Sequence, residues 1–190
     1  MTNILRPTHV EVNLKNLTHN LKVIRDRVGS RKVMGIVKAN AYGHGLVEIA
    51  KHLEKENIDY LGVAFIEEAI AIRKAGVRTP ILVLGGLDND QIEMFLENDI
   101  TITGSSIEKL QAISSKAKSL NKVAKVHLKV DTGMGRIGVQ WNRVEPFIKK
   151  AFQLPNLEIE GIFSHFISSS LDLELTKKQL HRFNSVLDIV

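Results

Sequence analysis

Strand-like and helix-like segments alternate along the whole chain, and this alternation constrains the fold more than any other feature of the sequence. Short apolar runs bounded by Gly, Pro and Asn are typical of buried strands. They occur at 32–37, 60–64, 80–84, 99–103, 123–130 and 157–163. Helical patterns separate the runs, at 46–53, 66–75, 106–118 and 175–190, and an alternating strand at 9–14 and a helix over 16–28 come first. This order predicts an α/β fold with a parallel sheet and right-handed crossovers.

Two local signals place helix ends. Gly76 is expected to end the helix over 66–75, because glycine readily adopts the left-handed conformation that closes a helix. Ser105 and Glu108 have the spacing of a capping box and are expected to open the helix over 106–118.

Two architectures satisfy this order of elements. A doubly wound open sheet is complete with five or six strands, whereas a (β/α)8 barrel typically takes about 250 residues. Since the chain has 190 residues, length alone favours the open sheet, and the motifs described below favour the barrel. No linker interrupts the pattern, so residues 1–190 are expected to form one domain.

Composition excludes several classes of protein. The chain has no Cys, which excludes disulfides, thiolate zinc sites and a cysteine nucleophile. No apolar run approaches the roughly 18–20 residues of a membrane helix, and the N-terminus does not resemble a signal peptide. We therefore expect a cytoplasmic protein that has no membrane partner.

The charge distribution and the histidines argue against further classes of protein. The formal net charge is +5, but Lys and Arg are interleaved with Glu and Asp. This distribution favours a solvated surface over a nucleic-acid interface, and it is compatible with a positive cleft for an anionic cofactor. The histidines show no metal-ligand spacing, so no metal site is expected. Neither GxSxG nor GxxxxGK[ST] occurs, which argues against a serine hydrolase and a P-loop NTPase.

The first motif, VKANAYGHG at 37–45, places Lys38 at the end of an apolar strand. Burial of an unpaired ammonium is costly, and a lysine that loses its proton becomes a nucleophile. Gly43 and Gly45 then precede a helical pattern, whose N-terminus would suit a phosphate. A nucleophilic amine beside a phosphate site is what a pyridoxal phosphate enzyme requires. An alternative interpretation fits the same spacing equally well: Lys38 is a lysine at a strand end whose amine reaches solvent, and the glycines form an ordinary turn.

The second motif, HLKVDTGMGRIG at 127–138, contains a literal GxGxxG after a strand. That is the outline of a dinucleotide-binding fingerprint and would suit a nicotinamide-dependent oxidoreductase. Two observations argue against this alternative. The motif lies in the fifth unit of the series rather than the first. Arg136 also stands inside the turn, where its planar donor fork suits a carboxylate or a phenolate oxygen.

The third feature is Ser164-His165-Phe166, which follows the sixth apolar run. Lys38, Arg136 and His165 thus all fall at or just after the carboxyl ends of predicted strands. In a parallel α/β fold these ends share one face, and sites form there. We therefore expect the functional site at this face.

Taken together and in order, these motifs resemble those of the bacterial alanine racemase family. The matching segments are VKANAYGHG at 37–45, KVDTGMGRIG at 129–138 and SHF at 164–166, and residues 62–86 are also similar. The resemblance implies a fold-type III (β/α)8 barrel that carries pyridoxal 5'-phosphate, followed by a C-terminal β-domain. It also implies a homodimer that interconverts L-alanine and D-alanine and supplies D-alanine for peptidoglycan.

The resemblance also implies a role for each site residue. Lys38 would form the Schiff base to the cofactor and act as one of two proton bases, and Tyr42 would hydrogen-bond the cofactor phosphate. Arg136 would contact the phenolic oxygen of the cofactor and the carboxylate of the substrate. Lys129 would lie beside Arg136, and this lysine is carbamylated in some members; His165 would join the polar network around the cofactor ring.

By the same resemblance, the chain corresponds to about the first six strands of the barrel. The C-terminal β-domain, whose tyrosine is the second base, would lie beyond Val190, so this chain is expected to have little activity alone. Another fold-type III protein, either a basic-amino-acid decarboxylase or a cofactor-homeostasis protein, is the alternative. The continuations AYGHG and TGMGRIG favour the racemase.

Overall fold

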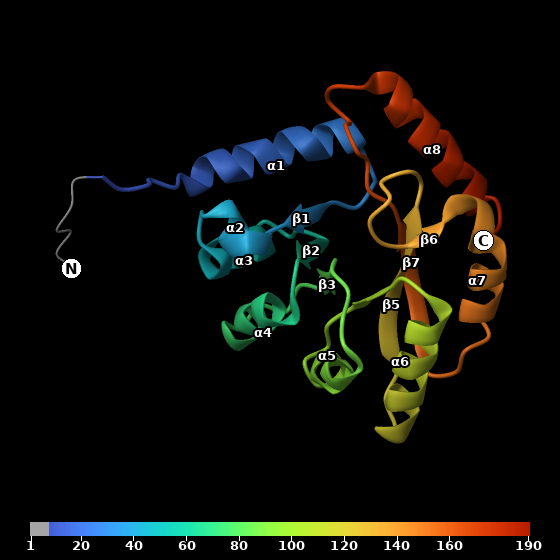
Figure 1. Ribbon diagram of the computed structural model, residues 1–190. Coiled ribbons are helices and arrows are strands. Elements are labelled where there is room, and N and C mark those ends of the chain that lie inside the picture. The colour runs from blue at the N-terminus through green and yellow to red at the C-terminus, as the bar shows by residue number, and fades with distance from the viewer. Residues whose placement is uncertain (1–7) are drawn as a thin grey trace. The chain divides into compact units, whose positions relative to one another are not determined.

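The computed structural model describes residues 8–190 and contains two compact units, one up to Ile81 and the other from Leu82 to Val190. Each unit is built of parallel strands connected by helices (Figure 1). None of the helices within residues 8–190 has the length and apolar character needed to cross a membrane. The assignment of residues 1–190 to one incomplete barrel domain stays a prediction.

The first unit holds a parallel sheet in the order β1-β2-β3. Its elements are α1 (Leu14–Val28), β1 (Met34–Ile36), α2 (Lys38–Tyr42), α3 (Leu46–Lys55), β2 (Tyr60–Val63), α4 (Ile66–Lys74) and the start of β3 (Ile81–Val83). Met34 pairs with Tyr60 and Ile36 with Gly62, so the carboxyl ends of β1 and β2 lie side by side. Apolar side chains of β2 and α4 are fully buried, including Leu61, Val63 and Ile72.

The second unit is organised around β5 (Ala124–Asp131), which pairs in parallel with three other strands. These partners are β4 (Ile102–Gly104), β6 (Val139–Gln140) and β7 (Leu157–Phe163). The helices are α5 (Ile92–Glu97), α6 (Ile107–Ser119), α7 (Val144–Ala151) and α8 (Leu173–Leu187), with short 3₁₀ helices at η1 (Asn89–Gln91) and η2 (Trp141–Arg143). The α6 helix packs on β4, β5 and β7 and also contacts α7 (Figure 1).

The strand predictions at six positions are confirmed, because each expected apolar run contains one of β1, β2, β3, β4, β5 or β7 or overlaps it within one or two residues. The predicted strand at 9–14 is wrong. Residues 8–13 have no regular structure, and Val10 is 77% exposed. A segment with this alternating pattern forms a strand only where a neighbouring strand hydrogen-bonds its backbone N–H and C=O groups. No strand pairs with this segment among residues 8–190.

Helix ends follow from local hydrogen bonds. Gly76 has φ +90 and its N–H donates to the carbonyl of Arg73, which confirms that it ends α4. The predicted cap at Ser105 is wrong by one residue. The side chain of Ser106 accepts the Lys109 N–H at 3.3 Å, because the extended backbone of Ser106 turns its hydroxyl toward the first turn of α6.

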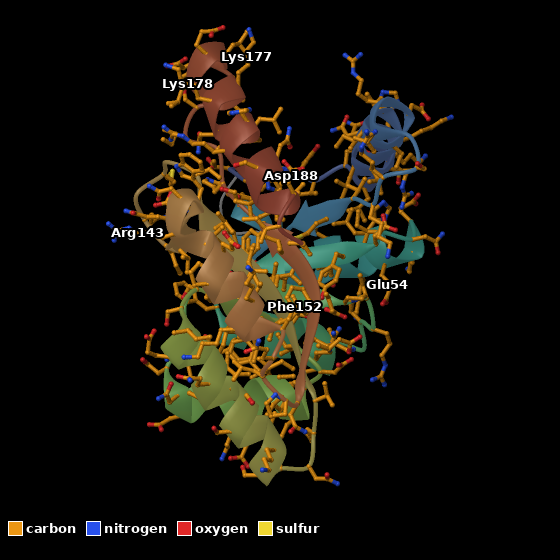
Figure 2. All side chains as sticks on the ribbon, turned by 90° about the vertical axis from the view of Figure 1, so that its right-hand side faces the viewer. Glu54, Arg143, Phe152, Lys177, Lys178 and Asp188 are labelled. Carbon is orange, nitrogen blue, oxygen red and sulfur yellow. The ribbon has the colours of Figure 1, made fainter. Side chains whose placement is uncertain are left out.

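A carboxylate on α3 anchors the chain before β3. Glu54, labelled in Figure 2, accepts hydrogen bonds at Oε1 from the N–H of Arg78 at 2.6 Å and from the N–H of Thr79 at 2.9 Å. Burial raises the pKa of Glu54, but these hydrogen bonds and the nearby charge of Arg73 outweigh burial and lower it overall. The ionised form of Glu54 is therefore the one that stabilises this connection.

Candidate active site

Lys38 lies immediately beyond β1, as the sequence predicts. Val37 before it is 1% exposed, and its N–H donates to the carbonyl of Gly62 at 2.8 Å, which extends the pairing of β1 with β2 by one residue. Lys38 itself is half-buried. Lys38 therefore follows directly after the last residue that hydrogen-bonds β2, and its side chain is partly accessible.

The residues that follow Lys38 form a left-handed turn. Ala39, Asn40, Ala41 and Tyr42 have φ values of 52, 55, 52 and 53, so the segment drawn as α2 is not a right-handed helix. This conformation costs about 1–2 kcal/mol for each residue that has a Cβ. Backbone hydrogen bonds close the turn, among them Ala41 N–H to the carbonyl of Val37 at 2.8 Å. Four consecutive residues in this region are retained only where the surroundings hold them there.

The side chain of Asn40 joins this turn to α3. Its Oδ1 accepts the N–H of Leu46 at 2.8 Å, and its carbonyl accepts the N–H of Gly45 at 3.0 Å. One of the N–H groups at the start of α3 is thus already satisfied by the protein. Tyr42, at the other end of the turn, is 61% exposed and presents its phenol to solvent.

In the second unit, Asp131 shapes the loop between β5 and β6. Its Oδ1 accepts the N–H of Gly133 at 2.8 Å, and its Oδ2 accepts the N–H of Gly135 at 3.0 Å. Gly138 has φ +115, and a Cβ on it would lie 2.8 Å from the carbonyl oxygen of Lys129. The three glycines therefore allow the loop to fold back against its own strand.

This loop does not form a dinucleotide-binding fingerprint. In that fingerprint the third glycine opens a helix that binds the pyrophosphate. Here Gly138 leads into the strand β6, and the next helical segment, η2, begins at Trp141. The structure thus removes the main support for the nicotinamide-dependent alternative.

Lys129 is buried on β5, with 4% of its surface exposed. Its Nζ lies 4.0 Å from the centroid of the Phe163 ring, a cation–π contact across the β5–β7 pair. Burial, together with the charge of Arg136 and against that of Asp131, lowers the pKa of Lys129 to about 8. A substantial fraction of this amine is therefore neutral just above neutral pH.

The second unit brings Arg136, His165 and Lys129 together. All three line one small hollow, with Asp131, Met134 and Ile137. The hydroxyls of Thr132 and Ser164 are 2.8 Å apart and connect the carboxyl ends of β5 and β7. Lys38 and Tyr42 belong to the first unit. Within residues 8–190 no group of three His, Asp or Glu side chains is arranged to hold a metal ion.

No local sequence pattern predicts the contacts that several other residues make in these two clusters. Glu68 and Asn40 hydrogen-bond the backbone around Lys38, and Gln179 hydrogen-bonds the hydroxyl of Thr132 and the carbonyl of His165. The one available signal was the polar Gln179 among the apolar positions of its helix, which is unusual for a buried site.

The fold and the two clusters define an α/β protein with polar and charged side chains at the carboxyl ends of parallel strands, where sites form in such folds. Residues 12–190 match the family model described as "Alanine racemase, N-terminal domain". The chain therefore belongs to the alanine racemase family, which confirms the α/β-barrel class and the family predicted from the sequence.

Individual relatives agree with this assignment. The chain is 43% identical to alanine racemase 2 of Caldanaerobacter subterraneus subsp. tengcongensis over 96% of its own length and 48% of the relative. It is 40% identical to the alanine racemase of Carboxydothermus hydrogenoformans, with coverage of 96% and 50%. The solved structure of alanine racemase from Clostridium difficile 630 superposes with a TM-score of 0.93 at 42% identity, covering 98% of this chain and 50% of that one. The chain thus spans about half the length of the relatives it matches.

Proposed function

We propose that the protein containing this chain interconverts L-alanine and D-alanine with pyridoxal 5'-phosphate, and that Lys38 holds the cofactor covalently. The observation that carries the proposal is the position of Lys38, a half-buried residue beyond the end of β1, followed by a turn held in an unfavourable backbone conformation. Strain of this kind is maintained at functional sites more often than elsewhere.

The residues present fit such a cofactor. Lys38 supplies an amine for the aldehyde, and the exposed phenol of Tyr42 can donate a hydrogen bond to the phosphate. Arg136 is exposed beside the hollow it shares with His165, so its guanidinium can take the phenolic oxygen of the cofactor and the carboxylate of the substrate. When bound, pyridoxal phosphate supplies an electron sink that acidifies the α-proton of the amino acid.

The chain's own residues then bind and move protons. When the amino group of the substrate takes the place of Lys38 on the cofactor, Lys38 Nζ would be released as a free amine. We assign to this amine the removal and return of the α-proton on one face of the substrate, since an amine accepts a proton and its ammonium form gives it back. Arg136 orients the substrate by its carboxylate, and His165 contributes a polar group at the cofactor ring. The second proton base would come from residues outside this chain.

We also propose that Lys129 reacts with carbon dioxide. A neutral amine adds to CO2 and releases one proton, which leaves a carbamate with one negative charge. The pKa of about 8 supplies the neutral amine, and the nearby guanidinium of Arg136 would stabilise the anion that forms. The carbamate would then hold Arg136 in place for its ligand.

The identity of the substrate rests on the relatives. Histidine racemase from Leuconostoc mesenteroides subsp. sake and alanine racemase from Streptomyces lavendulae are both 28% identical to this chain, so identity at that level does not separate the two substrates. The relatives at 40–43% identity described above are alanine racemases. We therefore propose alanine as the substrate, a homodimer as the working assembly, the cytoplasm as its location and peptidoglycan synthesis as the use of D-alanine.

Borohydride reduction tests whether Lys38 is the residue that holds the cofactor. The protein is incubated with pyridoxal phosphate, treated with borohydride and digested for peptide mapping, and its racemisation of alanine, serine and histidine is compared. We expect a reduced adduct on Lys38 and the fastest turnover with alanine. An adduct on another lysine would overturn the role of Lys38, and faster turnover of histidine or serine would overturn the substrate.

A further inference from the structure

We propose that Glu68 is a positioning residue that fixes the backbone carrying Lys38. The carboxylate of Glu68 accepts the N–H of Ala39 at Oε1, with a distance of 2.6 Å. Its Oε2 accepts the N–H of Ala64 at 2.8 Å and that of Phe65 at 3.4 Å. One side chain therefore binds the residue after Lys38 and the two residues after β2.

The position of Glu68 in α4 explains why its carboxylate can reach both the N–H of Ala39 and the N–H groups that follow β2. It is the third residue of α4, and its contact with Phe65 N–H is the side-chain half of a capping box. That contact needs only one carboxylate oxygen. Because β1 and β2 run parallel and in register, the end of β1 lies next to the start of α4, and the second oxygen faces Ala39 N–H.

The contact with Ala39 restricts the backbone conformation of Lys38, because the two residues share a peptide plane. The N–H of Ala39 belongs to the same planar unit as the carbonyl of Lys38. Holding that N–H fixes the rotation about the Cα–C bond of Lys38. The peptide plane on the other side of Lys38 is held because its carbonyl, that of Val37, accepts the N–H of Ala41 at 2.8 Å. The bonds at the Cα of Lys38, including the one to its side chain, are thus held between two anchors.

The same contact supports the left-handed turn. Ala39 is the first of the four residues with positive φ, and its N–H is the first donor of the turn. Without an acceptor there, this N–H would turn toward water and the turn would lose one of the interactions that offset its conformational cost. Both carboxylate oxygens of Glu68 accept backbone N–H groups, so we assign it no contact with the cofactor or the substrate.

The inference rests on the proposed function of Lys38, and Glu68→Gln separates it from a general loss of stability. Glutamine still caps a helix through its one oxygen. Its other terminal atom is an NH2 donor, which cannot accept the N–H of Ala39. Glu67→Gln is the matched control, because it removes the same charge from the same helical turn at an exposed position.

Two measurements test whether Glu68 positions the backbone at Lys38. In cofactor-free protein, amide hydrogen exchange at Ala39 is expected to be about tenfold to a hundredfold faster in Glu68→Gln, the range for losing a bond to a charged acceptor, while the amides of α4 keep their wild-type rates. In the holoenzyme, kcat for alanine is expected to fall about tenfold with little change in KM. Glu67→Gln should match the wild type in both.

The outcomes that overturn the inference differ from those that overturn the proposed function. Wild-type exchange at Ala39 in Glu68→Gln, or an equal loss in Glu67→Gln, would show that Glu68 does not position this backbone. Reduction of wild-type protein that leaves Lys38 unmodified would instead refute the proposed function. The exchange rate at Ala39 would still decide whether Glu68 holds the turn.

Discussion

The carboxamide of Gln179 donates a hydrogen bond to the hydroxyl of Thr132 at 3.1 Å and so ties α8 to the end of β5. Gln179 is 0% exposed, and its Nε2 also donates to the carbonyl of His165 while its Oε1 accepts the N–H of Ile167. A single buried amide therefore joins the segments that follow β5 and β7.

Gln179→Leu is expected to lower the free energy of unfolding by about 2–4 kcal/mol, because it leaves buried polar groups without their partner. Urea denaturation measures this loss. Lys178→Ala is the control, since Lys178 lies on the outward side of α8 (Figure 2) and should change stability by less than about 0.5 kcal/mol. Equal stability of Gln179→Leu and wild type would show that this network contributes nothing.

Gly138→Ala is expected to destabilise the protein by at least about 2 kcal/mol. A Cβ there meets the carbonyl oxygen of Lys129 at 2.8 Å, and the φ of +115 is disfavoured for alanine. Gly135→Ala, in the same loop, has φ +69 and open space around its Cβ, so it should cost only about 1 kcal/mol. Thermal unfolding of the two variants compares them, and the opposite order would contradict the close approach of the loop to β5.

Lys129 is expected to make stability depend on pH above neutrality. Its pKa falls from 10.5 to about 8 on folding, so between these values the unfolded chain binds more protons than the folded one. Stability therefore rises with pH across this window, by about 3 kcal/mol from this group alone. The measurement is the difference in unfolding free energy between wild type and Lys129→Met in CO2-free buffer from pH 7 to 10.5. A difference that does not change with pH would refute the lowered pKa.

Arg136 is expected to act through the geometry of its guanidinium as well as its charge. Arg136→Lys keeps the charge but loses the planar fork, so kcat/KM for alanine should fall about tenfold, and Arg136→Ala should lower it about a hundredfold or more. Steady-state assays of the holoenzyme compare the two variants. Near-native activity in both would exclude Arg136 from the substrate site.

Much of the fold was predictable because the signals are local. The apolar runs and the helical patterns between them indicated the strands β1, β2, β3, β4, β5 and β7 and the helices that follow most of them. The segment at 9–14 was mispredicted for a complementary reason. Its alternation of apolar and polar residues is a local signal, whereas forming a strand depends on a neighbour elsewhere in the chain.

For the candidate site, too, some features could be predicted from local signals and others could not. The order of elements placed Lys38, Arg136 and His165 beyond the ends of parallel strands, and the structure confirms those positions while their roles stay predictions. The left-handed turn at 39–42 was not predicted, because none of Ala39, Asn40, Ala41 and Tyr42 is a glycine.

The sequence by itself determined the α/β alternation, the family and the chemistry-bearing residue types, because these depend on the order and spacing of side chains along the chain. Only the tertiary structure decided that Glu68 holds the N–H of Ala39 and that Gln179 joins Thr132 to His165. Those contacts depend on which strand end lies beside which helix. Parallel pairing brings together residues that are 29 and 47 positions apart, and no local pattern specifies the partner at such a separation.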